Sequence, residues 1–589
     1  MSDLHWGPRT GPDGTTFRLW APGCESLTLS IEHVDHPMER HEDDWFTVTV
    51  PARTGDAYGF TLPDGRLLPD PAAHAQIGDV HGRSKVFVPE HEWRNAAPDT
   101  PWEAAVVYEC HIGTFTPEGT YRAAAAKLDH LVDLGVTVLE LMPVAQWAGD
   151  RGWGYDGVLL YAPHPAYGTP DDLRALVDAA HGKGLLVVLD VIYNHFGPEG
   201  CYIGAHAPDF FDEDRHTPWG AGIHYTEDAV RRFFVDNAVY WLESFRFDGL
   251  RLDAIDHIHD PSDPEILIEL GRQVRARVDH PVHIMTEDNR NVTFLHERPN
   301  GVAEIMTAEW NDDWHHCAHV LATGETEGYY GAFAEDPAGL MARSMATGFA
   351  YQGQAFDGQA AQGGAILDQE PRGEPSGHLP PQCFVDFLQN HDQVGNRAIG
   401  ERISTLAPQP AIDALHAALL LSPHIPLLFM GEEYGETRPF LFFADFHDEL
   451  GRAVTEGRKR EFAGFMGHDA DEVPDPIDVH SFLRSKLDWD RAASPEGRAE
   501  IVKVREWIAL RRAHVVPHLA GMRDGGGTAL DAPRGCVAVD WRLHGATLRM
   551  RANFTDAAAD MEMPAGAPFH VTGAAPGAAF SAAFWSERA

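Results

Sequence analysis

Two patterns of hydrophobic and polar positions divide the chain. Over residues 1–90, short apolar runs are separated by turn residues, as in "GPDG" and "LPDG"; the runs are "FRLWAP", "SLTLSIE", "WFTVTVP" and "AYGFTL". Short strands between Gly, Pro and Asp turns are typical of a small β-sandwich. We therefore predict an immunoglobulin-like β-sandwich domain over residues 1–92.

A different pattern begins after the Pro-rich segment "RNAAPDTPW". Continuous apolar runs now alternate with helical segments; the runs include "AVVYECHI", "VTVLELMPV", "LLVVLDVIYNH", "FDGLRLDAID", "PVHIMTED", "CFVDFLQNHD" and "IPLLFMGEEYG". Continuous Val, Ile and Leu runs joined by helices indicate a parallel sheet that is buried on both faces. About eight such units predict an α/β fold with a (β/α)8 TIM barrel over residues 93–520.

The last part of the chain is strand-like again. The change follows the helical segment "AEIVKVREWIALRRAH", at about residue 521. We predict a small C-terminal β-domain over residues 521–589, so the barrel is flanked by one β-domain on each side.

One predicted barrel strand, "FDGLRLDAID" at residues 247–256, carries unusual charges. Leu250 and Leu252 share one face at a period of two, and Arg251 and Asp253 share the other. In a barrel strand one face packs on helices and the other points inward, so the two charged side chains are expected at the barrel mouth. The alternative at this point is a structural ion pair at a strand end.

Other predicted strands also end in polar residues. These residues are Asp190, Asn194, His195, Glu287, His391 and Asp392. Each alone could be a capping or hydrogen-bonded structural residue. Active sites of TIM barrels lie at the carboxyl ends of the strands, so together these residues predict one site rich in carboxylates.

The types of residue at this site narrow the chemistry. The sequence shows no metal-ligand spacing and no phosphate-binding glycine loop, so we predict neither a metal nor a cofactor. Carboxylates without a metal suit glycoside cleavage, in which one attacks the anomeric carbon and another donates a proton to the leaving oxygen. Arg251 would favour the ionised form of a neighbouring aspartate. Nearby aromatic residues could stack on sugars or belong to the core; they are Trp147, Trp153, Tyr155, Trp310 and Trp314.

Composition excludes several classes of partner. The 589-residue chain has a formal net charge of −43, which would repel nucleic acid and anionic membranes. No apolar stretch is long enough to span a membrane, and "MSDLHWGPRTGPDG" lacks the features of a signal peptide. The six cysteines are scattered without a CxxC pair. We expect reduced thiols in a cytoplasmic enzyme, with neither a disulfide framework nor a zinc site.

Four of the strand-end stretches resemble the conserved regions of the α-amylase superfamily, glycoside hydrolase family 13. The stretches are "DVIYNH", "GLRLDAID", "TED" and "QNHD". The resemblance implies that Asp253 is the nucleophile, Glu287 the acid/base and Asp392 the transition-state stabiliser. It also implies that Arg251 orients Asp253, and that His195, His391 and Tyr155 contact the sugar in subsite −1.

A finer resemblance, over nearly the whole chain, is to the superfamily members that release trehalose from maltooligosyltrehalose. It is carried by "YECHIGTFTPEGTY", "RGWGYDGVLLYAPHPAYGTPDDL", "EWNDDWHH", "FLQNHDQVGNRAIGERIS" and "MGEEYGETRPFLFFADFHDEL". It implies hydrolysis of the α-1,4 bond next to the terminal trehalose, after a maltooligosyltrehalose synthase and without a stable complex. The implied substrate contacts are Asp256, His257, Asn311, Asp312, Asp313, Trp314, His315, Gln393, Asn396 and Arg397. "FRLWAP" resembles the sandwich domain that precedes the barrel in these and in branching enzymes.

The sequence departs from the resemblance at two places. Cys201 and Tyr202 follow "NHFGPEG", where an Asn is expected, and this difference could alter a contact at the rim of the site. Asn194 matches a position that holds calcium in many amylases, but the surrounding loop offers no oxygen cage, so no metal is predicted.

Two alternatives stay open. One is a glucan branching enzyme with the same carboxylates, and the other is a glucan-binding protein that has lost catalysis; intact Asp253, Glu287 and Asp392 disfavour the second. "EWNDDWHH" and "FLFFADFHDEL" favour the hydrolase. We expect "EWNDDWHH" to form a loop over the site that recognises the kinked 1,1-linked glucose pair.

Overall fold

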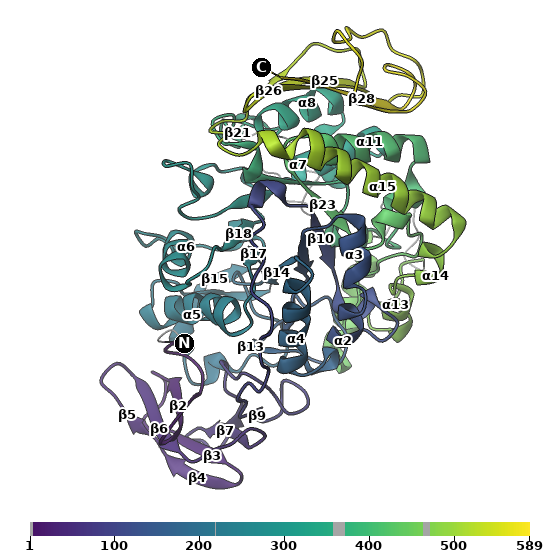
Figure 1. Ribbon diagram of the computed structural model, residues 1–589. Coiled ribbons are helices and arrows are strands. Elements are labelled where there is room, and N and C mark those ends of the chain that lie inside the picture. The colour runs from purple at the N-terminus through teal and green to yellow at the C-terminus, as the bar shows by residue number, and fades with distance from the viewer. Residues whose placement is uncertain (1–3, 218, 357–370, 463–471, 589) are drawn as a thin grey trace.

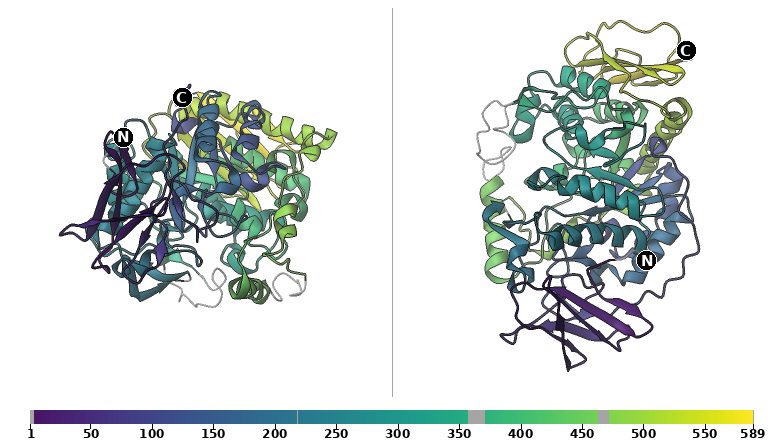
Figure 2. Two further views of the ribbon diagram at one scale, coloured as in Figure 1. Left: turned by 90° about the horizontal axis from the view of Figure 1, so that it is seen from below. Right: turned by 90° about the vertical axis from the view of Figure 1, so that its left-hand side faces the viewer.

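The computed structural model describes residues 4–217, 219–356, 371–462 and 472–588. Three bodies follow one another along its length (Figure 1): a β-sandwich at one end, a barrel surrounded by helices in the middle, and an antiparallel sheet at the other end. The side view in Figure 2 likewise places the N-terminal and C-terminal sheets at opposite ends of the barrel.

The N-terminal body is a sandwich of two antiparallel sheets. One has the order β1-β2-β6-β5 and the other β4-β3-β7-β8, with β9 paired to β7. The strands are β1 Arg9–Gly11, β2 Gly14–Trp20, β3 Thr28–Ile31, β4 Val34–Pro37, β5 Glu39–Arg40, β6 Trp45–Val50, β7 Ala57–Thr61, β8 Leu67–Leu68 and β9 Ser84–Lys85. Phe17 of one sheet meets Tyr58 of the other at 4.7 Å between ring centroids, so the apolar faces pack together. The predicted sandwich is confirmed.

The central body is a closed barrel of parallel strands in the order β10-β11-β14-β17-β18-β19-β22-β23, closed by pairing of β23 with β10. The strands are β10 Val107–Cys110, β11 Val138–Leu141, β14 Leu186–Val191, β17 Gly249–Leu252, β18 His283–Thr286, β19 Ala308–Trp310, β22 Phe384–Phe387 and β23 Ile425–Phe429. Nearly every residue in them is buried, which explains their continuous apolar sequences. The predicted barrel is confirmed.

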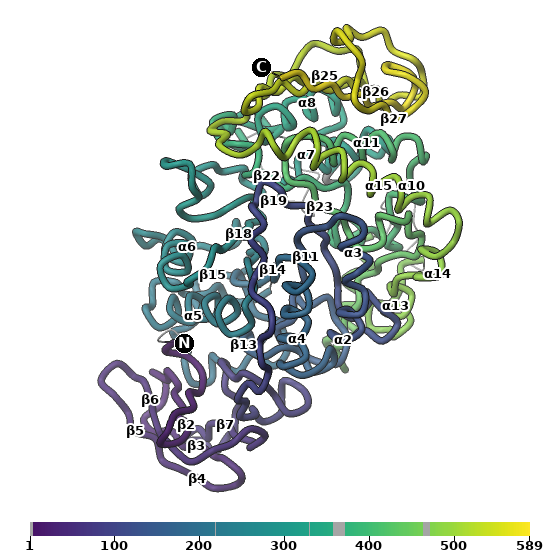
Figure 3. Tube along the Cα trace, in the orientation of Figure 1, coloured from purple at the N-terminus to yellow at the C-terminus, as the bar shows by residue number. Residues whose placement is uncertain are grey.

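Helices surround the barrel, as the tube in Figure 3 shows. They are α2 Tyr121–Ala125, α3 Leu128–Leu134, α4 Pro170–His181, α5 Asp228–Ser244, α6 Ile266–Arg277, α7 Asp312–Thr323, α8 Pro337–Thr347, α11 Gln409–Leu421, α12 Asp448–Phe462 and α15 Pro495–His514, with short helices α1 Ile112–Phe115, α9 His391–Gly395, α10 Ile403–Leu406, α13 Val479–Arg484 and α14 Trp489–Ala492. The connections between barrel elements also contain antiparallel strand pairs. These are β12 Ala145–Gln146 with β13 Leu159–Pro163, β15 Phe211–Thr217 with β16 Gly220–Ile223, and β20 Gln354–Ala355 with β21 Pro371–Arg372.

The inside of the barrel changes character along its axis. Its lower part is a separate apolar cluster that includes Val107, Val138, Val188 and Met285. Two residues further along each of these strands, the alternation of a β-strand brings Glu109, Glu140, Asp190 and Glu287 to the same inner face. Leu250 and Leu252 belong to the outer core, so Arg251 and Asp253 point inward as predicted.

The C-terminal body is an antiparallel sheet of order β24-β25-β26-β28-β27. Its strands are β24 Gly527–Ala529, β25 Cys536–Leu543, β26 Ala546–Asn553, β27 His570–Thr572 and β28 Ser581–Arg588. Trp541 is buried and donates its indole N–H to the carbonyl of Met345 in α8 at 2.8 Å, which attaches the sheet to the barrel layer. The C-terminal β-domain is confirmed, and the exact boundaries at residues 92 and 520 stay predictions.

Three further observations concern the described residues. None of their helices is long and apolar enough to cross a bilayer. The six cysteines are free thiols, and five of them are buried. Within the described ranges, no three His, Cys, Asp or Glu side chains gather in a geometry that could hold a metal ion.

Candidate active site

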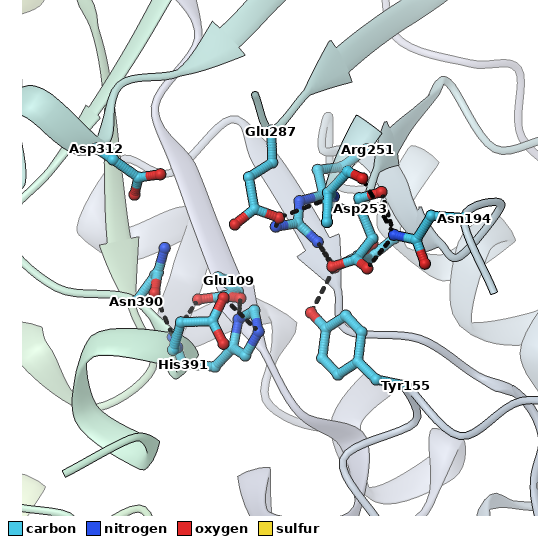
Figure 4. Close-up of polar contacts among 12 residues, drawn as sticks. Glu109, Tyr155, Asn194, Arg251, Asp253, Glu287, Asp312, Asn390 and His391 are labelled. Carbon is cyan, nitrogen blue, oxygen red and sulfur yellow. Dashed lines mark hydrogen bonds and ion pairs between the residues drawn. The ribbon is translucent and has the colours of Figure 1, made fainter. Parts of the chain in front are cut away.

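Arg251 is the centre of the polar group at the carboxyl ends of the barrel strands (Figure 4). Its guanidinium, fully buried, donates from Nη1 to Asp190 Oδ2 at 2.7 Å and to Asp253 Oδ1 at 2.9 Å, and from Nη2 to Glu287 Oε2 at 2.5 Å. Its other side lies over the Trp310 ring at 4.2 Å. One cation thus holds three carboxylates from neighbouring strands in a fixed arrangement.

Asp253 and Glu287 are held by different partners. Asn194 donates from Nδ2 to Asp253 Oδ2 at 2.9 Å, so both Asp253 oxygens accept hydrogen bonds. The next residue, Ala254, has a left-handed backbone (φ 39°), and its N–H donates to Glu287 Oε2 at 3.0 Å. Such a backbone is unfavourable for alanine and is found where a site constrains the chain. Among the described residues, Glu287 Oε1 has no hydrogen-bond partner.

Asp190 links Arg251 to Tyr155. The Tyr155 hydroxyl donates to Asp190 Oδ2 at 2.6 Å, the oxygen that also accepts from Arg251. Burial raises the pKa of Asp190 to about 7, with the charge of Asp253 adding to it and that of Arg251 opposing it. Asp190 therefore supports the site from below, as a buried partner of both Arg251 and Tyr155.

His391 packs on the ring of Tyr155, and Asp392 follows it in the chain. His391 stacks on the Tyr155 ring at 4.9 Å and contacts Asp392 Oδ2 through Nε2 at 3.4 Å. The Asn390 side chain caps α9 by accepting from the backbone N–H of Asp392 at 2.9 Å, which orients that residue. Burial raises the pKa of Asp392, and Glu287 adds to this while His391 opposes it.

The three carboxylates that the sequence assigned to catalysis are open to solvent to increasing extents. The exposed fraction of the side chain is 12% for Asp253, 16% for Glu287 and 31% for Asp392. Their positioning partners Arg251 and Asp190 are buried below them. The catalytic candidates are thus within reach of a substrate, and their supports are not.

His195 leads to a residue that the sequence analysis missed. Its ring pairs through Nε2 with the backbone carbonyl of Tyr155 at 3.0 Å, and Trp219 stacks on it at 4.1 Å. Trp219 is 39% exposed and also meets His257 edge-on at 5.3 Å. It lies in the turn of the β15–β16 hairpin. The sequence signal that could have found it is a tryptophan within the turn-like stretch "TPWG".

The segment "EWNDDWHH" differs from the expectation. It is not an overhanging loop: it contains strand β19, which the sequence analysis did not identify, and the first turns of α7. Trp314 is fully buried in the core, so its predicted contact with sugar is wrong for this structure. His315 is also buried and pairs with the Leu388 carbonyl at 2.7 Å. The cause is that this stretch of α7 is covered by other parts of the protein on more than one side, so consecutive residues are buried.

Asn311 and Asp313 are internal as well, which contradicts their predicted substrate contacts. Asn311 donates to Asp386 at 2.7 Å, and Asp313 accepts from the backbone N–H groups of Ala350 and Tyr351 at 2.8 and 3.0 Å. Both side chains therefore hold the backbone and other buried groups together.

Asp312 is the member of this segment that reaches the site. Figure 4 shows its carboxylate turned toward Glu287, and Gln393 donates to Asp312 Oδ1 at 3.2 Å. Burial raises the pKa of Asp312 well above its usual value, and the charges of Glu287 and Asp392 add to this. A carboxyl group in this position can form a hydrogen bond with a sugar hydroxyl.

The remaining predicted contacts surround the carboxylates. Asn396 donates to Asp392 Oδ1 at 3.2 Å, whereas Arg397 is paired with Glu325 at 2.8 and 3.0 Å and is almost buried. Burial raises the pKa of Asp256 to about 6; His257 opposes this, and Asp288 and Glu287 add to it. Their contact with sugar stays a prediction.

The other aromatic candidates are divided between core and site. Trp147, Trp153 and Trp310 are nearly fully buried, so core packing describes them better than sugar stacking. Trp153, for example, donates its indole N–H to the Leu441 carbonyl at 2.9 Å. Tyr202, in the divergent loop, contacts His81 of the sandwich at 2.6 Å and so takes part in a domain contact.

Comparison with known proteins agrees with this geometry. The model of the alpha amylase catalytic domain matches residues 92–217, and that of a domain family of unknown function matches residues 523–586. A crystal structure from Salmonella typhimurium, described provisionally as an alpha amylase, is 49% identical with a TM-score of 0.95, covering 99% of this chain and 100% of that one.

Two relatives separate the alternatives. A 1,4-alpha-glucan branching enzyme of Rhodospirillum rubrum is 34% identical, but over only 42% of this chain and 38% of its own length. The malto-oligosyltrehalose trehalohydrolase of Deinococcus radiodurans is 41% identical over 517 residues, which are 87% of this chain and 83% of that protein. With that identity over that length, the chain belongs to the malto-oligosyltrehalose trehalohydrolase family of the α-amylase superfamily.

Proposed function

We propose that this enzyme hydrolyses the α-1,4 bond that joins terminal trehalose to a maltooligosaccharide, with retention at the anomeric carbon. The observation that carries the proposal is the binding of Asp253 and Glu287 to one buried guanidinium, with Asp392 beside them. Two carboxyl groups on either side of a glycosidic bond are the machinery of glycoside hydrolysis. The 41% identity to a trehalohydrolase supports the choice of bond.

In the first step, an Asp253 oxygen forms a bond to C1 of the maltooligosaccharide as the bond from C1 to O4 of trehalose breaks. The leaving O4 takes a proton from Glu287. Glu287 Oε2 already accepts two N–H hydrogen bonds, from Arg251 and Ala254, so the proton belongs on Oε1. Trehalose leaves, and the maltooligosaccharide stays attached to Asp253 as an ester.

In the second step, water attacks C1 and the bond to Asp253 breaks. Glu287, now a carboxylate, takes a proton from the water through Oε1, which restores the acid for the next cycle. Arg251 stays in contact with both carboxylates, so it can stabilise negative charge as it passes from Asp253 to Glu287 in the first step and back in the second. In this proposal Asp392 stabilises the oxocarbenium-like transition states of both steps.

The physiological setting belongs to the same proposal. The substrates would be maltooligosyltrehalose and related α-glucans, supplied by a maltooligosyltrehalose synthase without a stable complex. A cytoplasmic location is supported by the six free thiols, which are usual in a reducing compartment.

A digest of maltooligosyltrehalose beside maltoheptaose tests the proposal, with products separated by chromatography and the Asp253→Asn variant as blank. We expect free trehalose and a shortened glucan from the first substrate, formed much faster than any product from the second. New α-1,6 linkages would support the branching enzyme instead, and the absence of any turnover would support a glucan-binding protein.

A further inference from the structure

Glu109, a buried carboxylate on β10, holds His391 at two points. Its Oε1 contacts His391 Nδ1 at 2.5 Å, and its Oε2 accepts the backbone N–H of His391 at 3.1 Å. Both side chains are 1% exposed. One carboxylate therefore fixes both the ring and the main chain of the residue that precedes Asp392 (Figure 4).

The other sides of the His391 ring are also occupied. Tyr155 stacks on one face with 16° between the planes, and Trp153 meets the ring edge-on at 5.5 Å. Nε2 is left for Asp392, 3.4 Å from its Oδ2. Two carboxylates therefore face the two ring nitrogens, Glu109 through a hydrogen bond and Asp392 as an ion pair, and such surroundings favour the imidazolium.

The charges around His391 come from several elements. Burial by itself would lower the pKa of His391, but the charges of Asp392 and Glu109 outweigh burial and raise the pKa to about 9, against an opposing contribution from Arg251. The titratable groups that face or act on the ring are Glu109 on β10, Glu140 on β11, Tyr155 before β13, Asp190 on β14, Arg251 on β17, Asp392 on α9 and His111 after β10.

We propose that Glu109 is a positioning residue that keeps His391 as an imidazolium, with Nε2 of its ring paired by charge with Asp392. The catalytic part of this role, though not the contact between Glu109 and His391, rests on the proposed function. Asp392 receives its orientation from both sides: the Asn390 cap holds its backbone, and the charged His391 holds its carboxylate. Glu109 thereby acts on the transition state through His391, without touching substrate.

Glu140 provides a matched control in the same layer of the barrel. It is the direct register partner of Glu109 across the β10–β11 pair, and it is equally buried. Neither of its oxygens has a hydrogen-bond partner in the described part of the chain. Burial raises its pKa well above the usual range, with Glu109 and Asp190 adding to this. A change to glutamine therefore keeps the size of the side chain and breaks no hydrogen bond in the described part of the chain.

The first test is spectroscopic and needs no substrate. Protein labelled with 15N-histidine should show a far-downfield Nδ1–H proton resonance for His391 in the wild type and in Glu140→Gln. Glu109→Gln should lose this resonance. Glutamine has only one acceptor oxygen, whereas Glu109 accepts with both of its oxygens. The glutamine NH2 group would therefore face another N–H group, either the Nδ1–H or the backbone N–H of His391. His391→Asn identifies the resonance.

The second test is the pH profile of kcat/KM on a maltooligosyl fluoride, a substrate whose leaving group needs little proton donation from Glu287. Glu109→Gln should lower kcat/KM about tenfold to a hundredfold near pH 8, as for a lost charge-assisted hydrogen bond. Its alkaline limb should move to lower pH by about one unit or more, because His391 loses a neighbouring negative charge. Glu140→Gln should keep the wild-type profile.

The outcomes separate the two proposals. The role of Glu109 would be overturned if the wild type shows no downfield resonance, or if the resonance survives in Glu109→Gln. The wild-type spectrum provides a test even if the variant does not fold. An unshifted alkaline limb in Glu109→Gln would also overturn it. Failure of the wild type to release trehalose would instead count against the proposed function alone.

Discussion

Trp219 lies parallel to His195, with 4.1 Å between the ring centroids and 11° between the planes. His195 in turn contacts the backbone of Tyr155, which hydrogen-bonds Asp190 below the catalytic carboxylates. The tryptophan is therefore connected to the site through one packed histidine. With 39% of its surface exposed, it is the large aromatic side chain best placed to meet a sugar ring beside His195.

Trp219→Ala should weaken use of substrate far more than it weakens the fold. We expect kcat/KM on maltooligosyltrehalose to fall. The fall should correspond to a loss of about 1–2 kcal/mol of transition-state stabilisation, the usual size of an aromatic stacking contact with some area burial. The thermal midpoint should change little because the side chain is partly exposed. Trp219→Phe is the control and should retain most activity; equal activity in Trp219→Ala and wild type would exclude a sugar contact.

Asp253→Asn should abolish nearly all turnover and leave the protein folded. An amide is a poor nucleophile, while the side chain keeps its shape and can still accept one hydrogen bond from Arg251 or Asn194. Steady-state rates and a thermal melt measure the two effects. Activity within tenfold of wild type would remove Asp253 from the role of nucleophile.

Glu287→Gln should impair natural glucosides much more than substrates with an acidic leaving group. Maltooligosyl fluoride needs little proton transfer, so it should be cleaved to the glycosyl-enzyme at a rate closer to wild type. The comparison is the ratio of kcat/KM for the fluoride to that for maltooligosyltrehalose. Equal losses on both substrates would show that Glu287 is not the proton donor.

Asp312 and Trp314, two residues apart on α7, should behave differently. Asp312→Ala should lower kcat/KM for maltooligosyltrehalose more than for maltoheptaose, by about 1–3 kcal/mol, because it faces the site beside Gln393. Trp314→Ala should instead destabilise the fold by about 3–5 kcal/mol through a cavity in the core. A proportional loss on both substrates in Asp312→Ala would place the trehalose pocket on other residues.

Asp70, buried in the sandwich, should make stability depend on pH. Burial raises its pKa to about 6, against hydrogen bonds from Ala72 and Tyr58, and an unfolded aspartate titrates near ~3.9. The folded state binds the Asp70 proton more tightly than the unfolded state does. The contribution of this proton to the free energy of unfolding is therefore complete below pH ~3.9 and is lost as pH rises through about 6.

The measurement is the unfolding free energy of wild type minus that of Asp70→Asn, using the full-length protein. This difference should fall by up to about 3 kcal/mol between pH 4 and pH 7, which corresponds to a shift of about two pKa units. Asp13→Asn, at an exposed position of the same domain, should show no such trend. A constant difference for Asp70→Asn would contradict the raised pKa.

Much of the barrel and its main residues could be predicted because local patterns report them. A buried strand needs a continuous apolar run, and a polar residue directly after such a run must lie at the carboxyl end of a parallel sheet. This reasoning found Asp253 and Glu287, and the alternation within one charged strand found Arg251; the structure joins all three within hydrogen-bond distance. Glu109 carried the same signal, two residues after Val107 on one inner face, but lay inside its strand instead of after it.

The sequence by itself therefore determined the alternation of elements and the side of each strand that faces the barrel axis, since both follow from backbone periods of 2.0 and 3.6 residues. Only the tertiary structure decided what each polar residue meets. Asp312 and Asp313 are neighbours in sequence, yet one faces Gln393 at the site and the other holds the backbone of Ala350. Successive helical residues point about 100° apart, and their partners lie dozens of residues away in the chain, so packing alone assigns one to the substrate side and the other to the core.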